Sequence, residues 1–374
     1  MSREIEARPG PLTWAGIIAA TCLLLAVLDS VLWLVLPFLF ALPLYYLLYP
    51  ALRRIMFAGV SRESACLIVT GVFLLVALIL GLLVAPRLVA RFADTGASVE
   101  RYVAGGVALL ERTLAALEQS SGLLARAKLS SLVTAWLNEF SATFTERHLQ
   151  PALVAAAGWL PALLLTPFFA FFFLRDGKNF QRFLARAVPN AYFEKTLFLT
   201  HEVSAAARGY FEGLLLLTVL DTVCLALGLW WLGMPGPLIL GFAAAVLAWV
   251  PYVGSIAGCV LVVLVAATDF SGQPEIAWQA VALFILVRML DDFVFMPLTI
   301  GRSLRLPPVI SVLMLFVGGA IAGVVGLMLV LPLLGVVMVV GITMGEIVTD
   351  PRLRARHRYA QRLRARGASV DLSV

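Results

Sequence analysis

Charged side chains are scarce in this sequence. Aspartate, glutamate, lysine and arginine together make up 13% of its 374 residues, whereas hydrophobic residues make up 61%. A soluble domain of ordinary composition carries about 25% charged residues. So few charges cannot cover a surface that faces water, which excludes a soluble enzyme, a disordered protein and a secreted disulfide scaffold. The composition predicts an integral membrane protein.

The motifs of common enzymes and metal proteins are also missing. No GxxxxGK[ST] phosphate loop, HExxH, GxSxG or dinucleotide fingerprint occurs. We therefore expect no ATPase and no other enzymatic activity on this chain. The four cysteines stand singly in apolar runs and the three histidines are far apart, which gives no zinc-ligand spacing. We therefore expect no metal ion and no cofactor.

Positive charge is concentrated at the end of the chain. Residues 351–366 contain seven arginines and no acid, whereas the formal net charge of the whole chain is only +6. Segments rich in arginine and lysine stay in the cytoplasm, so both termini are predicted to be cytoplasmic, with the tail close to anionic lipid. Nucleic-acid binding is not expected, because no groove with interleaved aromatic residues accompanies the tail.

Apolar runs of membrane-spanning length recur along the chain. A spanning helix needs about 20 mostly apolar residues. Such runs lie at 11–28, 31–50, 64–85, 151–174, 210–232 and 277–300. They predict about six full spans.

Two further apolar runs, 237–267 and 309–346, are too long for one straight span. The first is interrupted by Pro251, which removes a helix donor, and the second by four glycines between 318 and 326. Each run is either a re-entrant hairpin or one strongly tilted span. Hairpins agree better with the positive-inside rule, because they place the loop 268–276, which contains two acids and no base, outside the cell.

The predicted fold is therefore an all-α polytopic membrane protein with about six full spans and two long broken helices. If both broken helices are re-entrant hairpins, residues 210–267 and 277–346 each form a span followed by a hairpin, and the two hairpins enter from opposite sides. This is an inverted repeat. In transporters such a repeat places the substrate site near the middle of the membrane, where the broken helices meet.

Four regions are predicted along the chain. They are the N-terminal transmembrane segments (1–85), an amphipathic helical region outside the membrane core (86–150), a transport core (151–350) with a cytoplasmic linker (175–209), and the arginine-rich cytoplasmic tail (351–374). The amphipathic region has apolar residues at helical spacing. We expect a homo-oligomer, because so apolar a chain offers few other surfaces that could bury these faces.

Ionisable residues inside the spans are costly unless they are paired or face water. Asp221 lies near the middle of its span and is either a coupling carboxylate or one bonded to a neighbouring helix. Arg288 can reach Asp291 and Asp292 at helical spacing, as a structural ion pair or as part of a site. One arginine cannot neutralise two aspartates, so a charge remains for an ion, a proton or a substrate. These four residues are the candidates for ion or proton coupling.

The break at Pro251 is followed by Tyr252, Gly254 and Ser255. Gly254 and Gly258 form a GxxxG pair of the kind that packs membrane helices, while unwound carbonyls and two hydroxyl groups could line a polar path. The predicted transport pathway comprises Pro251, Tyr252, Gly254, Ser255, Asp291, Asp292, Pro297, Gly318, Gly319 and Gly323.

Four segments carry a resemblance to a known family. They are FAFFFLRD at 169–176, GYFEG at 209–213, LGMPGPLILG followed by WVPYVG at 232–254, and the glycine- and proline-punctuated segment that begins DDFVFMPLTIG at 291. The chain resembles the autoinducer-2 exporter family of bacterial permeases over its whole length, most specifically over 165–340.

The resemblance implies an inner-membrane transporter that exports a small hydrophilic molecule, such as the quorum-sensing signal autoinducer-2, by ion- or proton-coupled alternating access. Its partners would be the small-molecule or ion substrate and membrane lipids. A sodium (cation)/proton antiporter on the same scaffold is an alternative, since other members are linked to that activity. A second alternative is a non-transporting membrane scaffold that recruits partners through 86–150 and the tail.

Overall fold

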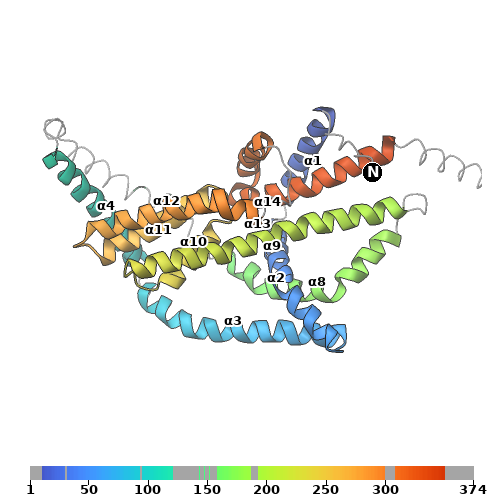
Figure 1. Cartoon of the computed structure of the whole chain (residues 1–374), viewed down its shortest axis with the longest axis horizontal. Coiled ribbons are helices and arrows are strands. Elements are labelled where there is room, and N and C mark those ends of the chain that lie inside the picture. The colour runs from blue at the N-terminus through green and yellow to red at the C-terminus, as the bar shows by residue number, and fades with distance from the viewer. Residues whose placement is uncertain are drawn as a thin grey trace, which may run out of the picture.

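The computed structural model describes residues 11–29, 32–92, 95–120, 158–186, 193–299 and 308–349, besides the single positions 143, 147 and 151. Across these ranges the regular structure is helical (Figure 1). In chain order the elements are α1 (Pro11–Asp29), α2 (Leu32–Phe57), α3 (Arg62–Phe92), α4 (Thr95–Ser120), α8 (Leu160–Arg186), α9 (Phe193–Trp231), α10 (Pro237–Leu247), α11 (Val253–Asp269), α12 (Pro274–Leu290), a π-helical turn (Asp291–Phe295), α13 (Met296–Thr299) and α14 (Pro308–Thr349).

Several predicted features fall outside these ranges. They are most of the second half of the amphipathic region, the start of the run predicted at 151–174, and the arginine-rich tail 351–374.

Five described helices are long and apolar enough to cross a membrane. The stretches are Val35–Phe57, Arg62–Leu83, Leu160–Gly177, Leu197–Trp231 and Val309–Ile342. The apolar part of α1, Trp14–Val27, is shorter, and the run predicted at 277–300 is not one helix, because α12 gives way to the π-helical turn after 17 residues. The chain is an all-α polytopic membrane protein.

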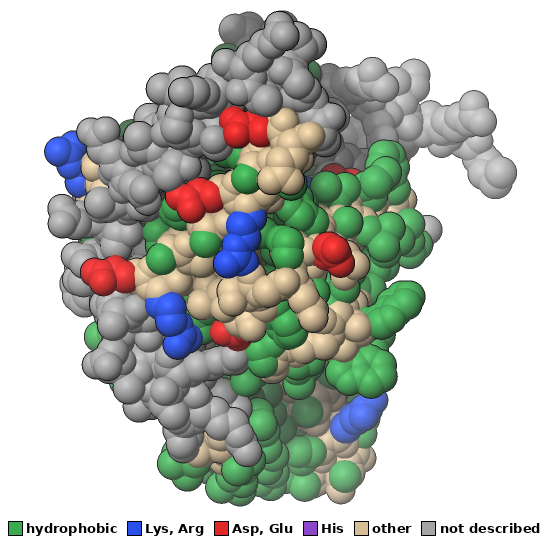
Figure 2. All heavy atoms as spheres, turned by 90° about the vertical axis from the view of Figure 1, so that its left-hand side faces the viewer, with side chains coloured by type: hydrophobic (Ala, Val, Ile, Leu, Met, Phe, Trp, Pro, Cys, Tyr) green, Lys and Arg blue, Asp and Glu red, His purple; other side chains and the backbone are tan. Residues whose placement is uncertain are grey.

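The surface of α3 supports this conclusion. Leu75, Leu78 and Leu82 are 57%, 60% and 66% exposed, and most of the helix between Gly71 and Leu83 is exposed as well. In Figure 2 most charged side chains lie in the middle and upper parts of the face, whereas hydrophobic side chains predominate at the bottom and lower right, around one basic side chain. Such a surface is stable only against lipid or another apolar surface.

The segment 175–209, predicted as a linker, is mostly helix. α8 continues through Arg186 and α9 already begins at Phe193. Both spans therefore extend beyond their apolar stretches as regular helix, and α9 is 39 residues long.

The first long run, 237–267, folds back on itself. α10 and α11 pack against each other on either side of a break at residues 248–252. Tyr252 has φ 61° and ψ −56°, a strained conformation for a residue with a side chain. Gly254 lies so close to the carbonyl group of Leu247 that a Cβ atom there would collide with it, and Gly258 packs on Ala244. The predicted GxxxG pair is thus a packing surface between α10 and α11.

The second long run, 309–346, also doubles back. α14 leaves helical geometry at Ala322 and Gly323, where Gly323 has φ 55°. A Cβ atom on Gly318 would lie 2.9 Å from Cβ of Val330, although a straight helix would separate these residues by about 18 Å. The two halves of α14 are therefore antiparallel neighbours, held closely together at Gly318 and Gly326.

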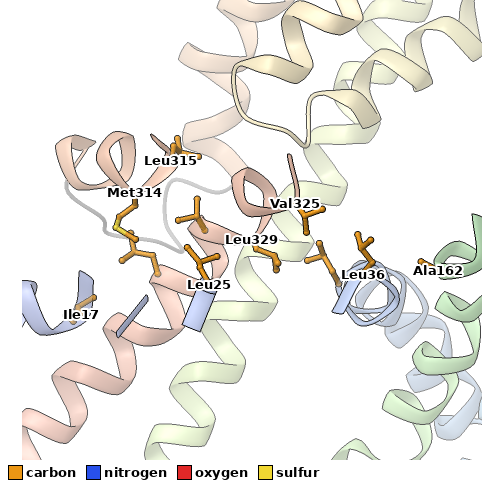
Figure 3. Close-up of a cluster of buried hydrophobic side chains, with 11 residues drawn as sticks. Ile17, Leu25, Leu36, Ala162, Met314, Leu315, Val325 and Leu329 are labelled. Atoms are coloured by element: carbon orange, nitrogen blue, oxygen red, sulfur yellow. The ribbon is translucent and has the colours of Figure 1, made fainter. Parts of the chain in front are cut away.

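A buried apolar cluster joins the ends of the chain (Figure 3). Ile17 and Leu25 of α1 and Leu36 of α2 belong to the same cluster as Met314 and Val330, which come from the two halves of α14. α4 is attached at the other end of the molecule through α11 and α12, where Trp278 Nε1 donates a hydrogen bond of 3.2 Å to Thr113 Oγ1. The helices at the centre, α9 to α14, carry the polar residues considered below.

Replacing Gly254 by valine should destabilise the α10–α11 hairpin, because the new side chain collides with the Leu247 carbonyl group. Overpacking of this kind costs about 1–3 kcal/mol. We expect a lower midpoint of thermal unfolding for purified Gly254→Val in detergent. Gly71→Ala is the control, since nothing lies within 4 Å of a Cβ atom there. Equal midpoints for Gly254→Val and the unaltered protein would contradict the close packing.

Candidate functional site

Three charged residues meet where α12 ends. Arg288, in the last turn of α12, forms ion pairs with Asp291 (Nη1 to Oδ2, 2.8 Å) and with Asp292 (Nη2 to Oδ1, 2.9 Å). The predicted spacing of i+3 and i+4 therefore does bring both carboxylates to one guanidinium group. The Arg288 and Asp292 side chains are 41% and 47% exposed, whereas that of Asp291 is only 9% exposed.

The two aspartates open a π-helical turn, Asp291–Phe295. A π turn places an extra residue in the helix, shifts the side chains that follow, and occurs often at functional sites. α12 therefore does not run on as a regular helix into α13. The turn follows directly after Arg288, so the ion pairs lie at the point where the helix changes geometry.

Asp221 reaches the same place from α9. Counted over the whole residue, backbone included, Asp221 and Asp291 are both 6% exposed. Two cavities, of about 330 and about 440 Å³, lie next to this group, and both are lined by Asp221, Arg288, Asp291 and Asp292. α9, α12 and the π turn thus bring together all four residues that were predicted to couple ions or protons.

Within the described part of the chain, two carboxylate oxygens of this group have no hydrogen-bond partner. They are Oδ1 of Asp221 and Oδ1 of Asp291, both buried. The group contains three carboxylates and one guanidinium, so its charges do not balance when all are ionised. Burying an uncompensated charge costs several kcal/mol, so a proton or a bound cation would stabilise this arrangement.

The break in the first hairpin contributes polar groups to the same region. Arg288 Nη1 donates a hydrogen bond of 3.3 Å to Ser255 Oγ, and Ser255 lines the smaller cavity. Pro251 and Tyr252 line the larger one. Trp249 Nε1 donates to Thr218 Oγ1 at 2.8 Å, which ties the break to α9 one turn before Asp221.

The structure divides the predicted pathway into two sets. Five members line one or both cavities: Pro251, Tyr252, Ser255, Asp291 and Asp292. The other five, Gly254, Pro297, Gly318, Gly319 and Gly323, line neither of them. Four of these are glycines, which serve close packing or the positive φ at the second break.

Some residues of the site were not predicted. Tyr210, Thr218, Trp249 and Ser311 also line the larger cavity. The signal for Thr218 was present in the sequence, because a residue three positions before Asp221 lies on the same face of a helix. Ser311 had no such signal, since only the folding of α14 brings its first turn to the cavity.

The structure is a bundle of membrane-spanning helices in which two helices are interrupted. A charged group lies between two cavities, beside the first interruption. Together these features are typical of membrane transporters. The chain belongs to the AI-2E family: the family model described as "AI-2E family transporter" matches residues 16–344. The resemblance seen in the sequence is confirmed at the level of the family.

Three bacterial relatives are similar to this chain. "Putative transport protein MT0215" of Mycobacterium tuberculosis (strain CDC 1551 / Oshkosh) is 28% identical over 323 residues, which is 84% of each chain. "Putative transport protein YueF" of Bacillus subtilis (strain 168) is 29% identical over 53% of this chain and 52% of its own. "Putative transport protein YrrI" of the same strain is 29% identical over 46% of this chain and 48% of its own. The chain thus matches about half the length of the two Bacillus proteins.

Replacing Arg288 by methionine should leave Asp291 buried without a counter-charge. Removing one partner of a buried pair costs about 3–5 kcal/mol, so we expect a clearly lower midpoint of thermal unfolding. Adding Asp291→Asn to Arg288→Met should recover part of the loss. Arg208→Met is the matched control, because it breaks the half-exposed Arg208–Glu212 pair (2.7 Å), which is worth about 1 kcal/mol or less. If Arg288→Met lowers the midpoint of thermal unfolding no more than this control does, the burial of Asp291 does not depend on its ion pair with Arg288.

Proposed function

We propose that this transporter exports a small hydrophilic molecule by alternating access, driven by a proton or sodium gradient. The observation that carries the proposal is the pair of buried carboxylate oxygens without partners, on Asp221 and Asp291, between two cavities. A gradient can drive transport only if the coupling ion binds one state of the protein better than the other.

The coupling step follows from the charges. When Asp221 and Asp291 are both ionised, Arg288 is paired with Asp291 and Asp292. Among the described residues that line the two cavities, that guanidinium group is the only cation near Asp221. Binding of a proton or Na⁺ at Asp221 or Asp291 removes the repulsion between these two carboxylates. The helices around the group can then rearrange. The ion thereby favours one of the two orientations of the site.

The broken helices supply the moving parts. The strained backbone at Tyr252 and the glycine break at Gly323 lie inside two apolar hairpins, and Ser255 links the first hairpin to Arg288. In this proposal both hairpins are re-entrant and belong to an inverted repeat, and substrate passes along Pro251, Tyr252 and Ser255.

The proposed setting is the bacterial inner membrane with both termini in the cytoplasm. The arginines of the tail 351–374 and the basic residues of 175–209 support this orientation. The regions 1–85, 86–150 and 151–350 act as N-terminal spans, an external assembly region and the transport core, and contacts through 86–150 make a homo-oligomer.

A sodium (cation)/proton antiporter is the second candidate. The excess of carboxylates over guanidinium groups in the site favours it, because such a site takes a cation directly. In that case the cation is the substrate and no organic molecule is exported.

Neutralising Asp291 should abolish coupling in proteoliposomes. We expect Asp291→Asn and Asp221→Asn to reduce proton-coupled uptake of radiolabelled autoinducer-2 at least tenfold, in vesicles that contain a pH-sensitive dye. Glu275→Gln is the control, because Glu275 is an exposed acid at the other end of α12. Proton flux that depends on sodium alone, and is lost in Asp291→Asn, favours antiport. If neither variant changes any flux while removal of 351–374 abolishes activity in cells, the protein is a scaffold.

Single cysteines at Val253 and Gly319 should report the topology of the hairpins. In an inverted repeat, we expect a membrane-impermeant thiol reagent to reach the two positions from opposite sides of the membrane, because the hairpins enter from opposite sides. The measurement is labelling of intact and inverted vesicles, with the native cysteines replaced by alanine. Labelling of both positions from the same side would contradict the inverted repeat.

A further inference from the structure

A third cavity, of about 480 Å³, lies between α2, α3, α8 and α9. It shares no lining residue with the two cavities beside Asp221 and Asp291. Its aromatic and basic lining consists of Tyr45, Tyr46, Tyr49, Arg62, Phe173, His201 and Arg208. Among the described residues that line it there is no carboxylate.

The polar groups come from α2, α9 and the start of α3. The tyrosine rings of α2 lie against one another, with centroid distances of 4.9 Å between Tyr45 and Tyr46 and 5.6 Å between Tyr45 and Tyr49. On α9, His201 and Arg208 are seven positions apart, which places them on the same side of a helix. Phenol hydroxyl, imidazole and guanidinium groups can all donate hydrogen bonds to an anion.

Arg62 is held in a fixed position. Its Nε and Nη2 donate hydrogen bonds of 3.0 and 2.5 Å to the carbonyl oxygen of Leu174. A guanidinium group has five N–H donors, so this carbonyl group does not use all of them. The neighbouring Glu63 pairs with Arg175 instead, at 3.6 Å. Within the described part of the chain, no carboxylate forms an ion pair with Arg62.

Arg208 lies on the other side of the cavity. It is paired with Glu212 at 2.7 Å and its guanidinium carbon is 5.6 Å from the centre of the Tyr49 ring. Glu212 is not one of the lining residues. The lining itself therefore holds two guanidinium groups and no carboxylate, while the nearby acids Glu212, Glu63 and Asp176 are paired with Arg208 or Arg175. This leaves Arg62 available for an anion.

We propose that this cavity binds the phosphate group of a phosphate ester. Guanidinium groups match the geometry of phosphate oxygens and can bind two of them at once. The volume exceeds that of a bare phosphate ion, so an organic group attached to it can lie along the tyrosine rings. The ester is either the headgroup of a membrane phospholipid or a small soluble molecule, and the two sources share the same recognition chemistry.

The test measures binding to the full-length protein purified in detergent. We expect glycerol 3-phosphate to bind the unaltered protein by isothermal titration calorimetry, and at least tenfold more weakly to Arg62→Gln and to Arg208→Gln. Native mass spectrometry tests the lipid source: a retained phospholipid should be present on the unaltered protein and lost from both variants. Arg53→Gln is the control, because Arg53 is an exposed arginine of α2 that packs on Phe57 outside the cavity.

Arg62→Gln also removes the contact between α3 and Leu174, so Tyr46→Phe is included as a variant that leaves this contact intact. It should weaken phosphate binding or lipid retention without lowering the midpoint of thermal unfolding. The proposal is overturned if the unaltered protein retains no phospholipid and binds no glycerol 3-phosphate, or if Arg62→Gln, Arg208→Gln and Tyr46→Phe bind as Arg53→Gln does. Because the cavities are separate, failure here leaves coupling through Asp291 unaffected.

Discussion

A charge inside a membrane must find a partner within the protein, and in this chain that requirement falls on Arg288. The guanidinium group is shared between Asp291 and Asp292, and it also donates to Ser255 of the neighbouring hairpin. Asp221 faces the same guanidinium group from α9 without a hydrogen bond of its own at Oδ1. α9, α11, α12 and the π turn therefore meet at one cation. A change in the protonation of either buried aspartate alters the forces on each of these elements.

Close contact between backbones is the second constraint. In a membrane there is little hydrophobic driving force between helices, so packing depends on small side chains that let backbones approach. Gly254 lies against Leu247, Gly318 against Gly326, and Gly241 of α10 against Ala226 of α9. These contacts allow the two arms of each hairpin to pack closely, and they allow α10 to pack closely on α9. They also give Gly254 and Gly318, two of the glycines predicted on the transport pathway, a role in packing.

Much of the fold could be predicted from the sequence, because hydropathy and chain breaks act locally. The apolar runs identified the helices, Pro251 and the glycine series located both breaks, and helical spacing brought Arg288 to Asp291 and Asp292. The π turn was not predicted, since nothing in the DDFVF segment distinguishes it from regular helix. The larger cavity could not be predicted from the sequence either, because Ser311 and Tyr210 line the same cavity as Asp221 only through long-range packing. The same is true of the cavity between Arg62 and Arg208, whose residues are 146 positions apart in the chain.

The bend at Gly323 has a consequence for the way the chain enters the membrane. Val309–Ile342 is 34 residues long and has no charge within it to mark an end. Insertion machinery that responds to hydrophobicity would treat such a segment as a single crossing. Folding back at Gly323 instead returns the chain toward the side from which it came. In the proposed re-entrant topology, the bend at Gly323 makes α14 enter and leave the membrane on the same side, so this long apolar helix adds no crossing.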